Sequence, residues 1–318
     1  MDFISAIAGL VLLLVAGDML VRGAVNLSLR LGVPALIVSL TIVAFGTSAP
    51  ELLISVSAIA EGVPGLALGN VIGSNTANIL LVLGIPALIS TLHVIDNSTR
   101  ASYLQMIGAS VLFILLAMRG TFDWISGIVL LLALFAMLAH AVYLARCHRS
   151  ASKAEAAEME EEEVEGADPG MPWWKIVIFL MLGLIGLPLG AEILVDASTN
   201  IARAYGVSET VIGLTLVALG TSLPELATTV MAALRKQADV AFGNVIGSNM
   251  FNLLGIIGVS SLVGTLPVEP ELMDFDIWVM LGCSVLLGVF VLRRIDITRL
   301  WGVVLSTLYI LYVLAVLN

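Results

Sequence analysis

Apolar segments of about 20 residues recur along the whole chain, separated by short polar stretches. A helix of that length crosses the roughly 30 Å of hydrocarbon in a bilayer. The pattern predicts an all-α polytopic membrane protein of ten transmembrane helices, at about 3–21, 33–60, 66–90, 101–118, 122–145, 173–196, 207–234, 240–265, 275–292 and 298–317. No basic region precedes the first apolar segment, so we expect that segment to be retained as a span.

The composition agrees with this class of protein. Hydrophobic residues make up 59% and charged residues 12% of the chain, whereas soluble domains carry about twice that share of charge. Much of the net charge of −10 comes from the acidic tract 155–165. The two cysteines and three histidines form no disulfide framework or metal-ligand cluster. We expect the lipid bilayer as surroundings, no nucleic-acid partner, no enzyme activity and no cofactor; a monomer is compatible with this organisation.

One stretch of the sequence occurs twice. Positions 41–85 align one to one with positions 215–259, at a constant offset and without a gap, and 22 of the 45 aligned pairs are identical. The identities concentrate in two polar motifs, GTSxPEL and GNVIGSN, rather than in leucines and valines. Such an internal repeat indicates duplicated halves. We therefore predict a first five-helix half at 1–145, a linker at 146–172 and a second half at 173–318.

The distribution of lysine and arginine predicts the orientation of the chain. With the N-terminus outside, the cytoplasmic connections carry twelve of the 14 basic residues, and the outer side carries only Arg119 and Arg203. Both termini are then outside and 146–172 is cytoplasmic, as a solvated linker or a low-affinity cation sensor. Because each half has an odd number of spans, the repeats cross in opposite senses. Inverted repeats are typical of secondary transporters, whose sites lie near the midplane.

The first motif places cation-binding chemistry inside an apolar span. Pro50 has no N–H, so the carbonyl of Gly46 loses its helical partner and the helix is expected to break around 44–48. Thr47 and Ser48 add hydroxyls at that break. Glu51 adds a carboxylate, which within a span marks a functional site by default. The second repeat carries the same set at Ala218, Gly220, Thr221, Ser222, Pro224 and Glu225.

The second motif predicts a polar stripe on the next helix. Asn70, Ser74 and Asn78 are four residues apart and share one helix face, and Asn75 lies off that stripe. The second repeat has Asn244, Ser248, Asn252 and Asn249 at these positions. We interpret Ser74 and Asn78 and their counterparts as ligands. Asn70, Asn75 and their counterparts are either ligands or helix–helix contacts. All donors are oxygen atoms, which suit Ca²⁺ and Na⁺.

Two further charges lie near the ends of predicted spans. Asp18 and Glu192 align with each other at the same offset as the two repeats. We interpret both as helix-end or packing residues, with a role in gating as the alternative. Asp18 is expected to pair with Arg22 one turn further on.

On these motifs the chain resembles the cation/Ca²⁺ exchanger superfamily, and within it the prokaryotic sodium/calcium exchanger-like antiporters. The resemblance implies that the second, third, seventh and eighth helices surround a central cation site, and that the first and sixth act as a sliding gate. It implies Ca²⁺ coordination by Glu51 and Glu225, which also share in Na⁺ binding, and by backbone carbonyls of Thr47 and Thr221. The implied Na⁺ ligands are Ala44, Ser48, Ser74, Ala218, Ser222 and Ser248, and Asn78 and Asn252 match the centre of the site.

One position departs from several relatives, which have Asp where this chain has Asn252. Two carboxylates then remain at the centre, which argues against K⁺ dependence. The expected function is Na⁺/Ca²⁺ antiport by alternating access in a prokaryotic inner membrane, with Ca²⁺ and Na⁺ as partners. H⁺/Ca²⁺ exchange or another cation/cation antiport is the alternative. A cation channel is less favoured because of the inverted duplication, and an intramembrane enzyme because no nucleophile–base pair or metal triad is visible.

Overall fold

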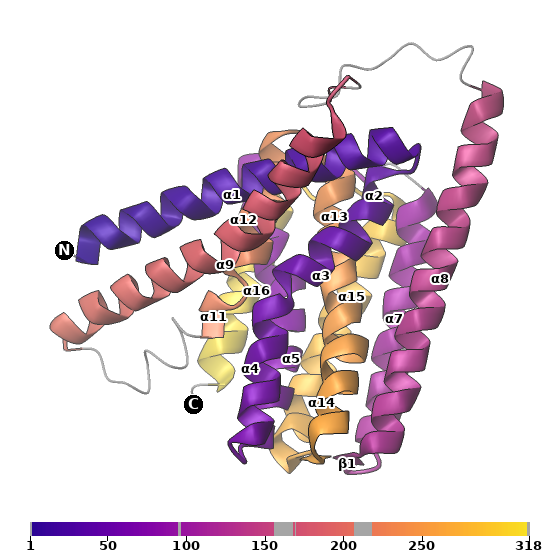
Figure 1. Ribbon diagram of the computed structural model, residues 1–318. Helices are drawn as coiled ribbons and strands as arrows, with labels where there is room; N and C mark the ends of the chain where they lie inside the picture. Colours follow the sequence, from indigo (N-terminus) through magenta and orange to yellow (C-terminus); the bar gives the residue numbers. More distant parts are fainter. Residues whose placement is uncertain (1, 95–96, 156–167, 169, 207–217, 317–318) are drawn as a thin grey trace.

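The computed structural model describes residues 2–94, 97–155, 168, 170–206 and 218–316. The described part is almost entirely helical (Figure 1). The first half contains α1 (Asp2–Leu31), α2 (Ala35–Val38), the π-helical turn η1 (Ser39–Val43), α3 (Ala44–Thr47), α4 (Ala49–Ala60), α5 (Pro64–Ala77), the π-helical turn η2 (Asn78–Val82), α6 (Gly84–Ile89), α7 (Asn97–Ala117) and α8 (Trp124–Glu155).

The described part of the second half has a similar series of elements. It contains α9 (Trp173–Ala204), α11 (Ala218–Gly220), α12 (Leu223–Leu234), α13 (Ala238–Met250), the π-helical turn η4 (Phe251–Ile256), α14 (Ile257–Val263), the π-helical turn η5 (Leu272–Asp276), α15 (Ile277–Arg293) and α16 (Arg299–Val316). Two short strands, β1 (Thr121–Phe122) and β2 (Leu266–Pro267), pair antiparallel and join the halves at one end of the bundle.

Most predicted spans correspond to a helix of the structure. Among the described residues, eight continuous helical runs are long and apolar enough to cross a membrane, and a bent pair, 35–47 with 49–60, makes a ninth. The predicted span 207–234 is described only in part, since 207–217 lie outside the described residues and α12 forms the remainder. The all-helical membrane architecture is thus confirmed, and the count of ten stays a prediction.

Three helices continue beyond their predicted ends. Helix α1 continues to Leu31 rather than ending near 21, α9 continues to Ala204 rather than 196, and α8 continues to Glu155, into the predicted linker. The residues after the apolar core of α1 still favour a helix because the Asp18 carboxylate pairs with Arg22 at 3.0 Å on the same face. Asp18 therefore lies within a helix and not near its end, whereas its expected pairing with Arg22 is confirmed.

Helices α1 and α9 pack along each other and lie obliquely to the other helices (Figure 1). Glycines allow their backbones to approach closely: a methyl group added to Gly9 would lie 2.7 Å from the nitrogen of Leu194, and one added to Gly23 would lie 2.9 Å from the side chain of Leu180. Because the contact of the later α1 residue is with the earlier α9 residue, the two helices are antiparallel. Small residues at such a contact are the usual means of helix association in lipid.

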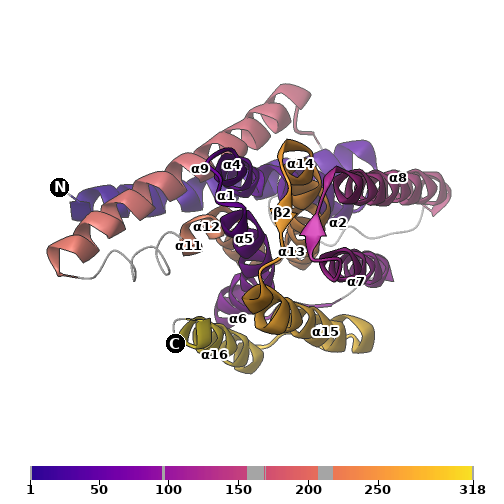
Figure 2. The same ribbon diagram turned by 90° about the horizontal axis from the view of Figure 1, so that it is seen from below.

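The helices of the two repeats form the centre of the bundle. In the most apolar 18-residue stretch of the run from α13 to α14, 83% of the residues are buried within the protein. The corresponding share is 72% in the run from α5 to α6 and 11% in α16. Seen along the bundle, α5, α12 and α13 lie inside, α7 and α8 lie on the right of the view, and α15 and α16 lie along its lower edge (Figure 2). The polar motifs therefore lie in the most enclosed part of the molecule.

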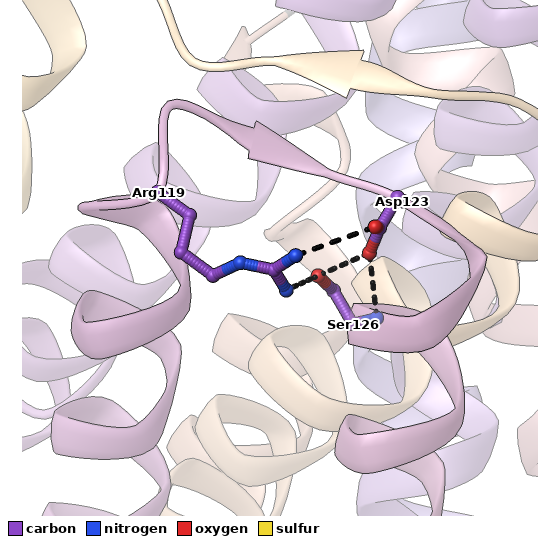
Figure 3. Close-up of polar contacts among 3 residues, drawn as sticks. All are labelled: Arg119, Asp123 and Ser126. Carbon is purple, nitrogen blue, oxygen red and sulfur yellow. Dashed lines mark hydrogen bonds and ion pairs between the residues drawn. The ribbon is translucent and has the colours of Figure 1, made fainter.

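A polar cluster fixes the turn between α7 and α8 (Figure 3). The Asp123 carboxylate accepts hydrogen bonds from the N–H of Ser126 at 2.9 Å and from its hydroxyl at 2.7 Å, and Arg119 contacts it at 3.4 Å. These contacts, the Ser126 N–H above all, lower the pKa of Asp123 below its ordinary value. The carboxylate thereby caps the first turn of α8.

Candidate cation-binding site

The second predicted span breaks where the proline pattern predicts it. Helices α3 and α4 meet at Ser48 with a bend of 42°. Ser48 has φ −86° and ψ 8°, which is outside the helical region, and Pro50 occupies the first turn of α4. In the second repeat Ser222 has φ −86° and ψ 1°, and Pro224 lies in the first turn of α12. The break expected at 44–48 is confirmed, and its counterpart has the same backbone geometry.

The two carboxylates lie directly after these breaks. Glu51 and Glu225 each occupy the first turn of their helix, where the helix dipole favours negative charge. Each residue is only 1% exposed. Oε1 of Glu225 accepts a hydrogen bond from Ser48 at 2.9 Å and one from Ser248 at 3.4 Å. The hydroxyl at the break of the first repeat thus contacts the carboxylate of the second, so the two half-sites form one site.

Two asparagines join the halves through reciprocal hydrogen bonds. The amide nitrogen of Asn75 donates to the backbone carbonyl of Asn249 at 3.3 Å, and Asn249 donates to the carbonyl of Asn75 at 3.4 Å. Their side-chain oxygens accept from Asn252 at 3.1 Å and from Asn78 at 3.0 Å. Asn75 and Asn249 are therefore helix–helix contacts, and they hold the amide groups of Asn78 and Asn252 in a fixed orientation.

The other asparagine pair supports the helices that carry the carboxylates. Asn70 donates to the backbone carbonyl of Glu51 at 3.4 Å and to the hydroxyl of Ser55 at 3.3 Å. In the second repeat Asn244 makes the matching bonds to the carbonyl of Glu225 at 3.3 Å and to Thr229 at 3.1 Å. All four asparagines therefore make helix–helix contacts through their amide nitrogens, and a role as ligands stays untested.

Several buried oxygen atoms at this centre have no hydrogen-bond partner among the described residues. They are Glu51 Oε2, Glu225 Oε2, Asn78 Oδ1, Asn252 Oδ1 and Ser222 Oγ. Burying an unpaired polar group is costly, and a carboxylate costs more than an amide. Such acceptors are the ligands that hard cations such as Ca²⁺ take in proteins. The described residues contain no group of three His, Cys, Asp or Glu side chains that could hold a metal, so the acceptors are two carboxylates supplemented by neutral oxygens.

The remaining predicted ligands differ in how far solvent reaches them. Ala44, Thr47, Ser48 and Ser248 are sealed from solvent, with exposures of 0–1%. The hydroxyl of Thr47 lies 3.3 Å from the Ala44 carbonyl and 3.3 Å from Asn244. By contrast, Ser74 and Thr221 line a cavity of about 430 Å³. Ala218 begins α11, and its side chain lies outside the described part of the chain.

Some contributors were not singled out from the sequence. Ser55 and Thr229 accept the bonds of Asn70 and Asn244, and the sulfurs of Met280 and Met106 lie 3.8 Å from the amide nitrogens of Asn75 and Asn249. Ser55 aligns with Thr229, and Met106 with Met280, at the offset that relates the two repeats. The same offset applied beyond the identical motifs would have identified them.

The fold and the site together define an all-helical integral membrane protein. At its centre, both repeats contribute buried oxygen atoms that have no hydrogen-bond partner among the described residues. The family described as sodium/calcium exchanger protein matches residues 1–143 and 175–318. The chain therefore belongs to the sodium/calcium exchanger family, which confirms the resemblance drawn from its motifs.

Individual relatives match over nearly the whole chain. The sodium/calcium exchanger MaX1 of Methanosarcina acetivorans is 31% identical over 98% of this chain and 97% of its own length. The inner membrane protein YrbG of Escherichia coli is 35% identical, over 91% and 88%. A solved structure of the sodium-calcium exchanger NCX_Mj superposes with a TM-score of 0.81 at 33% identity, covering 98% of this chain and 96% of that one.

Proposed function

We propose that the protein is a secondary active antiporter that exchanges Na⁺ for Ca²⁺ across the cell membrane by alternating access, with the two ions as its substrates. One observation carries the proposal: Glu51, Glu225, Asn78 and Asn252 each present a buried oxygen atom that lacks a hydrogen-bond partner among the described residues. MaX1 and NCX_Mj are named as sodium/calcium exchangers, which are transporters rather than enzymes. We propose no enzymatic activity and no resident cofactor.

The charge of the site explains obligatory exchange. One Ca²⁺ or several Na⁺ ions offset the two carboxylates, whereas the empty site would leave them buried without compensation. Crossing of the empty site is therefore disfavoured, and each ion depends on the other for the return step. Since residues 78 and 252 are both asparagine, no third carboxylate is present at this centre, and we propose that exchange does not require K⁺.

We further propose the ten-span topology with inverted halves, both termini outside and 146–172 in the cytoplasm of a prokaryotic cell. The antiparallel packing of α1 on α9 supports inversion, because these are the first helices of the two halves. The reciprocal bonds between Asn75 and Asn249 also support it, since each bond repeats the other with the partners exchanged. We propose a monomer as the functional unit.

The exposure of the site supports alternating access. Ser74 and Thr221 border the cavity, which also reaches Gly65 and Val316, positions that the proposed topology places near the outer surface. On the other side, α1 lies against α12, where a methyl group added to Gly17 would be 3.1 Å from the Ala227 carbonyl oxygen. We propose that this is the outward-facing state of the cycle.

The test is Ca²⁺ uptake into proteoliposomes loaded with Na⁺, compared with loading by K⁺, by choline or with a pH gradient. We expect uptake that requires internal Na⁺ and that is lost in the Glu51→Gln/Glu225→Gln double variant. Glu61→Gln is the matched control, since this exposed residue follows directly after α4.

Each other outcome would replace part of the proposal. Uptake driven by the pH gradient alone would identify an H⁺/Ca²⁺ exchanger. Uptake without any counter-ion would identify a channel. Normal Na⁺-dependent uptake by the double variant would refute the site assignment.

A further inference from the structure

The cavity beside the site has one acidic residue among its described lining residues. Its wall is contributed by α4, α5, the break before α12, η5 and the last turns of α16, and most of it is apolar. The polar exceptions include Asn70, Ser74 and Thr221 near the site and Asp276. The ligand set of the central site does not include Asp276, which is the last residue of η5.

Asp276 is held in place by an aromatic residue of a different helix. The hydroxyl of Tyr312 in α16 donates a hydrogen bond to its Oδ1 at 2.8 Å, and the Tyr312 ring stacks on Phe275 with the ring centroids 6.4 Å apart. Tyr312 itself lines the same cavity. The half-buried carboxylate is therefore fixed at the wall of the cavity rather than free to turn away, and Oδ2 is not used by this hydrogen bond.

A fixed negative charge in a cavity with apolar walls attracts cations. Low-dielectric walls focus the field into the cavity, which raises the local concentration of oppositely charged ions and their rate of association. We propose that Asp276, positioned by Tyr312, is a specificity-determining residue of the access route, which concentrates cations next to Ser74 and excludes anions. This inference rests on the proposed function in one respect: the cations that Asp276 concentrates are taken to be the transported ions.

The first test measures the electrostatics of the cavity without transport. In a variant with Cys147 and Cys283 replaced, Ser74→Cys is labelled with a trimethylammonium and with a sulfonate thiosulfonate reagent of similar size. We expect Asp276→Asn to lower the ratio of cationic to anionic labelling rates about threefold to tenfold, and Asp276→Glu to restore it. The effect should shrink in about 0.5 M choline chloride, where screening acts within a few ångströms.

A matched control separates the cavity from general surface charge. Asp274 lies in the same turn, η5, but is exposed and does not line the cavity. Asp274→Asn should therefore leave the labelling ratio within about twofold of the parent, since an exposed charge is screened by solvent. Tyr312→Phe should lower the ratio less than Asp276→Asn, because it frees the carboxylate without removing it.

The second test measures transport in membrane vesicles of each orientation. Asp276→Asn should raise the apparent KM for Ca²⁺ about threefold at the face bearing the cavity, leaving the maximal rate and the other face unchanged. An unchanged labelling ratio in Asp276→Asn, or equal changes in Asp274→Asn, would overturn the inference even if exchange is confirmed. Conversely, a changed ratio in a protein without Na⁺-dependent Ca²⁺ flux would uphold it and reject the proposed function.

Discussion

The two half-sites carry the same motifs but have different surroundings. Ser48 donates to Glu225 at 2.9 Å, whereas the hydroxyl of its counterpart Ser222 has no partner among the described residues. Ser74 and Thr221 are 5% and 8% exposed and line the cavity, and their counterparts Ser248 and Thr47 are 0% and 1% exposed. In each of these pairs of equivalent residues, one member therefore borders the cavity and the other is sealed from solvent.

The same difference extends to the long helices. Asp18 of α1 pairs with Arg22 and with Arg235, which follows α12, so an ionic bridge joins these two helices. The positions equivalent to these three in the opposite half are Glu192, Asp196 and Glu61, which are all acidic. These three positions therefore cannot form an equivalent bridge between α9 and the end of α4. Alternating access between inverted repeats, as proposed above, makes the outward- and inward-facing states asymmetric, and here the sequence itself adds to that asymmetry.

The largest expected effect tests whether the half-sites are equivalent as ligands despite their different surroundings. Glu51→Gln and Glu225→Gln should each lower Na⁺-dependent Ca²⁺ uptake about 100-fold or more, the consequence of losing about 3 kcal/mol of buried charge interaction. Both variants should also lose the rise in unfolding temperature that Ca²⁺ produces in the wild type. A variant that retained normal uptake would show that only the other carboxylate binds the ion.

The second prediction compares the two serines at the helix breaks. Ser48→Ala should lower the free energy of unfolding in ion-free detergent solution by about 1.5–3 kcal/mol, because it removes a hydrogen bond to a buried carboxylate. Ser222→Ala should change it by less than about 0.5 kcal/mol, since the Ser222 hydroxyl has no bond to lose among the described residues. Denaturant unfolding of the two variants provides the measurement. Equal losses would mean that the protein in solution does not maintain the asymmetry.

The third prediction tests accessibility. With Cys147 and Cys283 replaced, Ser74→Cys should be labelled by a water-soluble thiol reagent about tenfold faster than Ser248→Cys, since only the former lines the cavity. Adding Arg235→Gln to Ser248→Cys should raise its labelling rate up to about fivefold, because a surface-proximal ion pair contributes about 1 kcal/mol to the α1–α12 contact. Equal rates for the two cysteines would contradict the outward-open assignment.

The smallest effect concerns the turn between α7 and α8, remote from both half-sites. The pKa of Asp123 is lowered in the folded protein, so this carboxylate stabilises the fold above its ordinary pKa of about 3.9, and the contribution is lost as the pH falls through the folded value. Asp123→Asn should therefore lower the unfolding temperature slightly at neutral pH. The unfolding temperature of this variant should also fall less than that of the wild type when the pH is lowered into the acidic range. Thermal unfolding at several pH values measures this, and Ser126→Ala should give a smaller change in the same direction. If the unfolding temperature of Asp123→Asn fell with decreasing pH as steeply as that of the wild type, the capping role would be ruled out.

Much of the site was predictable from local chemistry. The break at Ser48 follows from Pro50, whose missing N–H acts within one turn of the helix. The roles of the asparagines were not predictable in the same way. Asn75 and Asn78 are of the same type and close together in the chain, and both donate to Asn249 of the opposite repeat. Only Asn78, however, has a side-chain oxygen without a hydrogen-bond partner among the described residues. Their roles depend on which helix faces each side chain, and that helix belongs to the other half of the chain.

The sequence by itself determined the membrane class, the duplicated halves, the helix breaks and the oxygen chemistry of the site. Apolar length, proline geometry and residue type act locally and are the same in every conformation. Only the tertiary structure decided the state: which serine finds a carboxylate, which member of each equivalent pair borders the cavity, and that Arg235 comes within reach of Asp18. These features depend on how two similar halves pack against each other, and identical motifs cannot specify which of two equivalent packings is occupied.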